Sequence, residues 1–112
     1  MDNDQLEKDV VTLGERRFVV IDFGRRTVAQ DHHIMKEIRR SGVDKVLPMD
    51  GESDSAYVIR LQTALIDSGR ACNLIAGYLI PEGKEERDWT PRMAEEIVAH
   101  ISRCNKIGRA HV

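Results

Sequence analysis

The residues with the clearest potential for chemistry are Asp31, His32 and His33, which follow one another along the chain. An Asp-His-His element can bind metal ions, so a small metal-dependent hydrolase is one hypothesis for this protein. The three residues fall in the first turns of a predicted helix, however, where consecutive side chains point about 100° apart. We therefore favour two surface histidines, with Asp31 placed near a helix N-terminus, where negative charge is stabilising.

A second candidate pair is His100 and Cys104, which lie four residues apart and can share one face of a helix. That spacing suits two ligands of one metal ion, but a structural zinc site needs four. The other candidate ligands are Cys72, His32, His33 and His111. Because the usual ligand pattern is missing, we interpret Cys104 as a small core residue and predict neither a metal site nor a cofactor.

Acidic residues alternate at Asp50, Glu52 and Asp54, as at the start of a calcium-binding loop. The glycine falls at the wrong place for an EF-hand, and no closing Glu follows at position twelve. We therefore interpret these acidic residues as helix caps and as surface charges that favour solubility. The sequence also has no glycine-rich phosphate loop, nucleophile elbow or paired-carboxylate motif, so we predict that the protein is not an enzyme.

Arginine pairs at 16–17, 25–26 and 39–40 support an alternative hypothesis, a nucleic-acid-binding regulator. If the elements aligned them, the pairs would form a basic strip that contacts phosphates. The acidic residues between them dilute this charge, and no aromatic platform for base stacking accompanies them. We favour solvated surface arginines, and nucleic acid is not an expected partner.

The elements that must position these residues begin with a β-hairpin. Val10 to Leu13 is a predicted strand, residues 14–16 a three-residue connection, and residues 17–23 the return strand. Alternation places Val19, Ile21 and Phe23 on the face toward the helices, with Phe18 on the other face. Residues 43–47 are either a third short strand or an extended link.

Four helices are predicted after the hairpin, over residues 28–40, 55–67, 71–79 and 91–104. Thr27 and Gln30 fit a capping box, and Thr90 with Pro91 fits an N-cap followed by the first helical position. The predicted core consists of Val19, Ile21, Phe23, Ile34, Ile38, Leu61, Leu65, Leu74, Ile75, Leu79, Ile97, Val98 and Ile101.

These elements predict a single α+β domain over residues 1–112, in which an N-terminal β-hairpin packs against three to four helices. Residues 1–8 and 105–112 are expected to be flexible ends. The chain is 41% hydrophobic and 32% charged with a net charge of −2, as in globular proteins. Its acidic start does not resemble a signal peptide, and no apolar run is long enough for a membrane span, so we expect a cytoplasmic protein.

The segment at 71–80 is apolar on nearly every side, which is typical either of a central helix or of an interface. One hypothesis is that Tyr78, Leu79, Ile80 and Trp89 border a protein-binding surface, used for self-association or for another protein. The alternative is that the domain buries this segment centrally. Trp89 has two corresponding interpretations, a hydrophobic staple that packs on Ala94 or an exposed anchor for a partner.

The order of elements resembles one known group of proteins. A hairpin over Thr12-Leu13-Gly14-Glu15-Arg16-Arg17-Phe18-Val19-Val20 precedes a capped polar helix, a helical pair follows, and the last helix opens with Trp89-Thr90-Pro91. This layout, over residues 10–104, is similar to that of the small tail assembly chaperones and related morphogenesis proteins of tailed bacteriophages and prophages. The resemblance implies a non-enzymatic factor without a cofactor that binds other tail proteins, in the host cytoplasm if phage-encoded.

Overall fold

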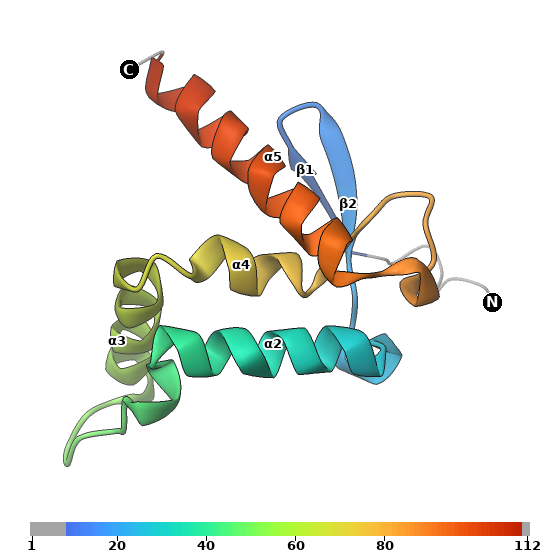
Figure 1. Cartoon of the computed structure of the whole chain (residues 1–112). Coiled ribbons are helices and arrows are strands. Elements are labelled where there is room, and N and C mark those ends of the chain that lie inside the picture. Colours follow the sequence, from blue (N-terminus) through green and yellow to red (C-terminus); the bar gives the residue numbers. More distant parts are fainter. Residues whose placement is uncertain (1–8, 111–112) are drawn as a thin grey trace.

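In residues 9–110, a three-stranded antiparallel sheet and four α-helices make up the fold (Figure 1). The structure is a computed structural model that describes residues 9–110. The strands are β1 (Val10–Leu13), β2 (Arg16–Val20) and β3 (Leu79–Pro81), in the order β1-β2-β3. The helices are α2 (Val28–Ser41), α3 (Asp54–Asp67), α4 (Ala71–Ala76) and α5 (Pro91–Ala110). This architecture confirms the predicted α+β class, with a hairpin and a third strand packed against helices.

The hairpin turn is shorter than predicted. Leu13 pairs with Arg16, so Gly14 and Glu15 alone connect β1 to β2. Gly14 has a φ of +65°, in the left-handed region that residues with a side chain rarely adopt. The turn also packs tightly, because a Cβ at this position would lie 2.7 Å from the Sγ atom of Cys104.

The third strand lies elsewhere than at residues 43–47. Those residues include a short 3₁₀ helix, η2 (Val43–Lys45), which follows directly on the end of α2. The predicted helix over 71–79 instead stops at Ala76, and the chain turns at Gly77 before β3 pairs with β2. Gly77 is needed for close packing, since a Cβ there would lie 2.7 Å from Ile34 Cγ1 and 2.9 Å from His33 Cδ2.

The helix starts agree with the predicted caps. Thr27 and Gln30 form the capping box of α2, and Gly42 ends that helix in the left-handed conformation. Thr90 Oγ1 accepts a hydrogen bond from the Met93 backbone N–H at 3.1 Å at the start of α5. That helix continues to Ala110 rather than ending at residue 104. Residues 1–8 and 111–112, which we expected to be flexible, lie outside the described residues.

Helices α2 and α4 pack against each other, and α4 also packs against α5. Figure 1 shows α3 across the far ends of α2 and α4, on the side of the molecule away from the sheet. Two further 3₁₀ helices, η1 (Phe23–Arg25) and η3 (Glu86–Asp88), precede α2 and α5. None of the helices in residues 9–110 is both long enough and apolar enough to cross a membrane.

The core lies between the sheet, α4 and the first half of α5. Its buried members are Phe18, Val19, Ile21, Ala76, Leu79, Ile80, Trp89, Ala94 and Ile97. Phe23, predicted to be buried, is 79% exposed because β2 ends at Val20 and the chain turns into η1. Phe18, predicted on the other face, is fully buried against the ring of His100. Ile75 is exposed as well, whereas Leu61 and Leu65 of α3 are half-buried.

Candidate protein-binding surface

Three of the four residues predicted to border a partner surface are inside the protein. Leu79, Ile80 and Trp89 are each at most 3% exposed, because β3 joins the sheet and α5 covers it. Tyr78 is half-buried, with the Arg26 guanidinium 5.0 Å from the centre of its ring. The predicted surface therefore needs correction, since the domain itself covers this apolar segment.

Trp89 acts as a staple rather than as an exposed anchor. Its indole N–H donates a hydrogen bond to the Ala76 carbonyl at 3.2 Å, and the His33 ring meets it edge-on at 5.3 Å. Trp89 belongs to the same buried cluster as Ala94, four residues into α5. This is the arrangement in which an apolar residue before the N-cap fixes the entry of the chain into a helix.

Exposed apolar side chains gather instead on α3 and on the segment leading to it. Val58, Ile59 and Ile66 of α3 are 47%, 61% and 67% exposed. Leu47 and Met49, just before the helix, are 69% and 59% exposed. No residue of α3 is buried. A surface helix normally directs its large apolar side chains toward the core, so this arrangement needs an explanation.

Helical geometry divides α3 into two sides. Tyr57, Leu61, Ala64 and Leu65 are half-buried and lie on one side. The opposite side contains only uncharged residues over three turns, and all of them are exposed. We call this side the α3 surface, and it consists of Ser55, Val58, Ile59, Gln62, Thr63 and Ile66. Sequence reasoning missed it because both sides of the helix contain apolar residues.

Polar contacts with the segment that precedes α3 hold this helix in place. The Tyr57 hydroxyl donates to the Val46 carbonyl at 2.7 Å. Arg60 donates two hydrogen bonds to the Glu52 carboxylate, at 2.6 and 2.9 Å, and one to the Leu47 carbonyl at 2.7 Å. The bond from Arg60 and the Met49 backbone N–H lower the pKa of Glu52 to about 2. These bonds hold the loop against the helix while its apolar side chains stay exposed.

A shallow groove of about 330 Å³ lies along one edge of the α3 surface. Its apolar part is formed by Val46, Ile59 and Ala64, next to Thr63. Arg60 and Asp67 also line it. A groove of this kind can take an apolar side chain from another helix, with polar groups at its margin.

The interface between α2 and α4 is unusually polar. Gln30 Nε2 donates to the Gly77 carbonyl at 3.2 Å, and His33 Nε2 lies 2.9 Å from the Asn73 carbonyl. A third contact joins Glu37 to Arg70, whose guanidinium donates two bonds to Glu37 Oε1 at 2.8 and 2.6 Å. The contacts repeat at helical spacing on both helices, and each buried polar side chain has a partner.

The Asp-His-His residues do not converge. Asp31 pairs with Arg26 at 2.8 Å, His32 is exposed, and His33 is buried in the α2–α4 interface. Asp50, Glu52 and Asp54 do not converge either, because Glu52 faces Arg60. Within residues 9–110 no group of three or more His, Cys, Asp or Glu side chains could hold a metal ion.

His100 and Cys104 share a face of α5, as their spacing predicts, with Nε2 and Sγ 3.6 Å apart. His100 Nε2 also lies 2.6 Å from the Leu13 carbonyl oxygen. Since a carbonyl can only accept, this nitrogen must carry a proton and donate it. It therefore has no free lone pair for a metal ion or for the thiol proton, and the pair secures the hairpin to α5.

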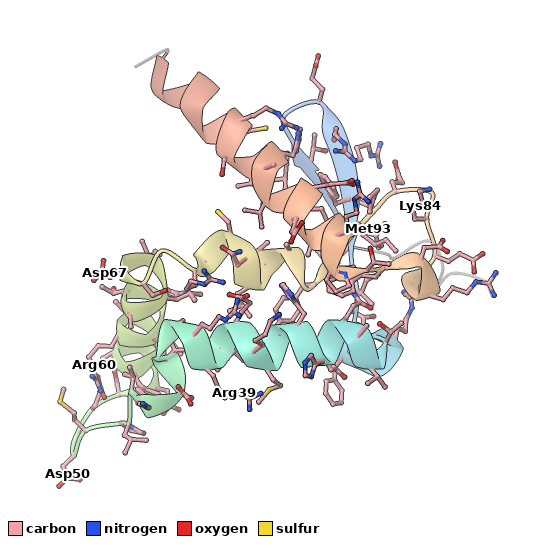
Figure 2. The ribbon with its side chains drawn as sticks, viewed as in Figure 1. Arg39, Asp50, Arg60, Asp67, Lys84 and Met93 are labelled. Atoms are coloured by element: carbon pink, nitrogen blue, oxygen red, sulfur yellow. The ribbon has the colours of Figure 1, made fainter. Side chains whose placement is uncertain are left out.

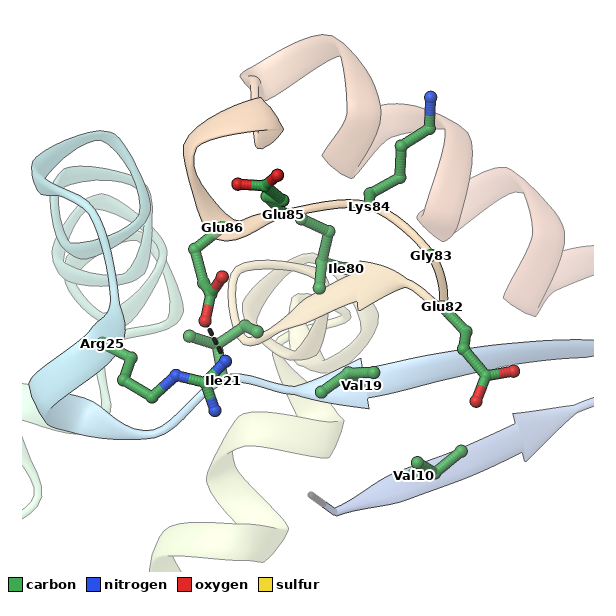
Figure 3. Close-up of a pocket in the computed structure, with 10 residues that line it drawn as sticks. All are labelled: Val10, Val19, Ile21, Arg25, Ile80, Glu82, Gly83, Lys84, Glu85 and Glu86. Atoms are coloured by element: carbon green, nitrogen blue, oxygen red, sulfur yellow. Dashed lines mark hydrogen bonds and ion pairs between the residues drawn. The ribbon is translucent and has the colours of Figure 1, made fainter. Parts of the chain in front are cut away.

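A larger cavity of about 500 Å³ lies between the sheet and the loop over residues 82–86 (Figure 3). Its floor is apolar, formed by Val19, Ile21 and Ile80, and its rim carries charges of both signs. Arg25 and Glu86 form an ion pair across the rim. The residues that line the cavity include no His, Cys, Ser or Thr.

The arginine pairs are largely neutralised by acidic neighbours. Arg17 pairs with Glu82 at 3.1 Å, and Arg40 approaches Glu37 at 3.4 Å. Arg25 and Arg26 pair with acids as described above. The pairs are also far apart, because the hairpin and the C-terminal end of α2 lie at opposite ends of the molecule (Figure 1). The described residues thus show no continuous basic strip built from these arginines.

Comparison of the chain with protein-family models, curated proteins and solved structures found no match.

Proposed function

We propose that this protein is a small, non-enzymatic protein-interaction factor that binds its partner through the α3 surface. The observation that supports this most directly is the exposure of Val58, Ile59 and Ile66 on a three-turn helix side without a charged residue. Contiguous exposed apolar surface on a small globular protein commonly marks an interaction site.

The domain gains little stability from these side chains. Val58, Ile59 and Ile66 stay 47–67% exposed, and β-branched residues also lower helix propensity compared with Leu or Ala. Polar contacts of Tyr57 and Arg60 hold the helix in place without them. A requirement for binding explains why apolar residues occupy positions where charged ones would cost the fold nothing.

The specific form of the proposal is an assembly factor like the tail assembly chaperones of tailed bacteriophages. The element order is what supports it: a hairpin, a capped helix and a helical pair precede a final helix that opens at Pro91, with β3 between the pair and that helix. In that role the client is another morphogenetic protein, and binding takes place in the host cytoplasm.

The test is affinity capture from cells that express the protein naturally. The tagged chain is compared with an Ile59→Ser/Ile66→Ser variant and with a Phe23→Ser/Val28→Ser control. The control removes exposed apolar area at the end of α2 opposite to α3. Capture of a protein that the first variant loses and the control retains supports the proposal. Capture of none, or equal capture by both variants, contradicts it.

A further inference from the structure

The charged side chains of residues 46–69 that form no ion pair with another described residue are all acidic. Residues 46–69 contain four acidic side chains and one basic side chain. The basic side chain, Arg60, forms an ion pair with Glu52. Asp50, Asp54 and Asp67 remain, all exposed, and no ion pair joins any of them to another described residue. Figure 2 shows Asp50 at the tip of the loop before α3 and Asp67 at the opposite end of the helix.

Asp67 is placed where its charge is unfavourable. It is the last residue of α3, where the helix dipole is negative, and no basic residue occupies that turn. It also lines the groove that Ile59 and Thr63 help to form. A basic group delivered to this groove from outside would therefore gain an ion pair and relieve the repulsion between Asp67 and the helix end.

A second copy of this chain does not fit the surface well. Two α3 helices packed antiparallel would bring Asp54 of one copy close to Asp67 of the other, and two packed parallel would align identical acids. Like charges placed opposite each other disfavour association. A stable interface of standard size also takes about 20–30 residues from each partner, far more than the six of the α3 surface.

From this charge pattern and shape we infer that the partner segment is a basic amphipathic helix of another protein. Its apolar side chains would pack on Val58, Ile59 and Ile66, and one of them would enter the groove. Lysine or arginine residues beside that apolar stripe would meet Asp54 and Asp67. This is the helix-in-groove mode of recognition, and it rests on the proposed function of the α3 surface.

The probe for this inference is a fluorescein-labelled 18-residue peptide of leucine and lysine, with leucines at helical spacing. Its matched control has glutamate at every lysine position. Fluorescence anisotropy with the full chain should show the lysine peptide binding at least tenfold more tightly than the glutamate peptide. Ile59→Ser/Ile66→Ser should weaken lysine-peptide binding about tenfold without a change in protein charge, and Phe23→Ser/Val28→Ser should leave it unchanged.

A second variant separates charge from apolar contact. Asp54→Asn/Asp67→Asn keeps the apolar side chains, and it should weaken binding several-fold and flatten its dependence on salt. Equal binding of both peptides, or lysine-peptide binding that Ile59→Ser/Ile66→Ser leaves intact, overturns the inference. The inference is also overturned if the protein sediments as a dimer and Ile59→Ser/Ile66→Ser sediments as a monomer, because a second copy then occupies the α3 surface. The proposed function survives these failures if affinity capture still depends on Ile59 and Ile66.

Discussion

The ion pair between Glu37 and Arg70 offers a quantitative test of how the polar α2–α4 interface stabilises the fold. The Glu37 side chain is 2% exposed and accepts two hydrogen bonds from Arg70, while Arg40 contributes only a contact of 3.4 Å from a largely exposed position. Arg70→Met leaves this carboxylate buried with that single weak partner. Removing one partner of a fully buried pair costs about 3–5 kcal/mol. Because Arg70 is 31% exposed and water can enter, we expect about 2–3 kcal/mol.

The measurements are urea unfolding and thermal unfolding, each followed by far-UV circular dichroism and by the fluorescence of Trp89, the single tryptophan. A loss of this size should lower the melting temperature by roughly 10–15 °C in a domain of about 100 residues. The double variant Glu37→Leu/Arg70→Met removes both charges, so it should be more stable than Arg70→Met alone. Single-variant losses that simply add up in the double variant would refute the reasoning, since they show no coupling between the two side chains.

Three further predictions concern single positions. Gly14→Ala should lower the free energy of unfolding in urea by about 1–2 kcal/mol, because residue 14 has a positive φ and the added Cβ would clash with Cys104 Sγ. Adding Cys104→Ala to the Gly14→Ala chain should recover part of the loss. Glu52, with its pKa lowered to about 2 by Arg60, stabilises the folded state above pH 4.5, and this contribution disappears as the pH falls from about 4.5 to 2. Glu52→Gln should therefore reduce the dependence of the melting temperature on pH in that interval. An unchanged dependence would contradict a stabilising role for the Glu52–Arg60 pair. Trp89→Phe should cost about 1–2 kcal/mol, because it leaves a buried carbonyl without its donor.

The parts of the fold that sequence predicted well depend on local chemistry. The capping box at Thr27 and the N-cap at Thr90 are each fixed by residues within four positions of one another. The hairpin was predictable because β1 and β2 are separated by a single tight turn. These features do not require knowledge of distant contacts.

The errors arise where distant segments meet. β3 has a partner about 60 residues earlier in the chain, and without it the apolar run at 79–81 has the periodicity of the preceding helix. The buried face of α2 contains Ile34, which was predicted to be buried, and also Gln30, His33 and Glu37, whose polarity predicts exposure. Their partners on α4 lie 33 to 47 residues away. Sequence reasoning therefore underestimated the burial of this face.

The candidate surface shows the same limit. The apolar residues of α3 were expected to enter the core, since Leu61 and Leu65 have helical spacing. The structure places α3 at the end of the domain, where only one side of the helix is covered. Conversely, one of two hypotheses placed Ile80 and Trp89 at the border of a partner surface, and β3 and α5 bury them. Which apolar segment stays exposed depends on tertiary packing.

The most direct test of the α3 surface is photo-crosslinking from Gln62, at the middle of that surface. A benzophenone amino acid replaces Gln62 in the full chain, and a second chain carries it at Val28, which is 85% exposed on α2. After irradiation in the cells that naturally express the protein, we predict a cross-linked partner protein from position 62 and none from position 28. Ile59→Ser/Ile66→Ser should abolish that cross-link. No cross-link from position 62, or the same products from both positions, would contradict the assignment of the α3 surface as the binding site.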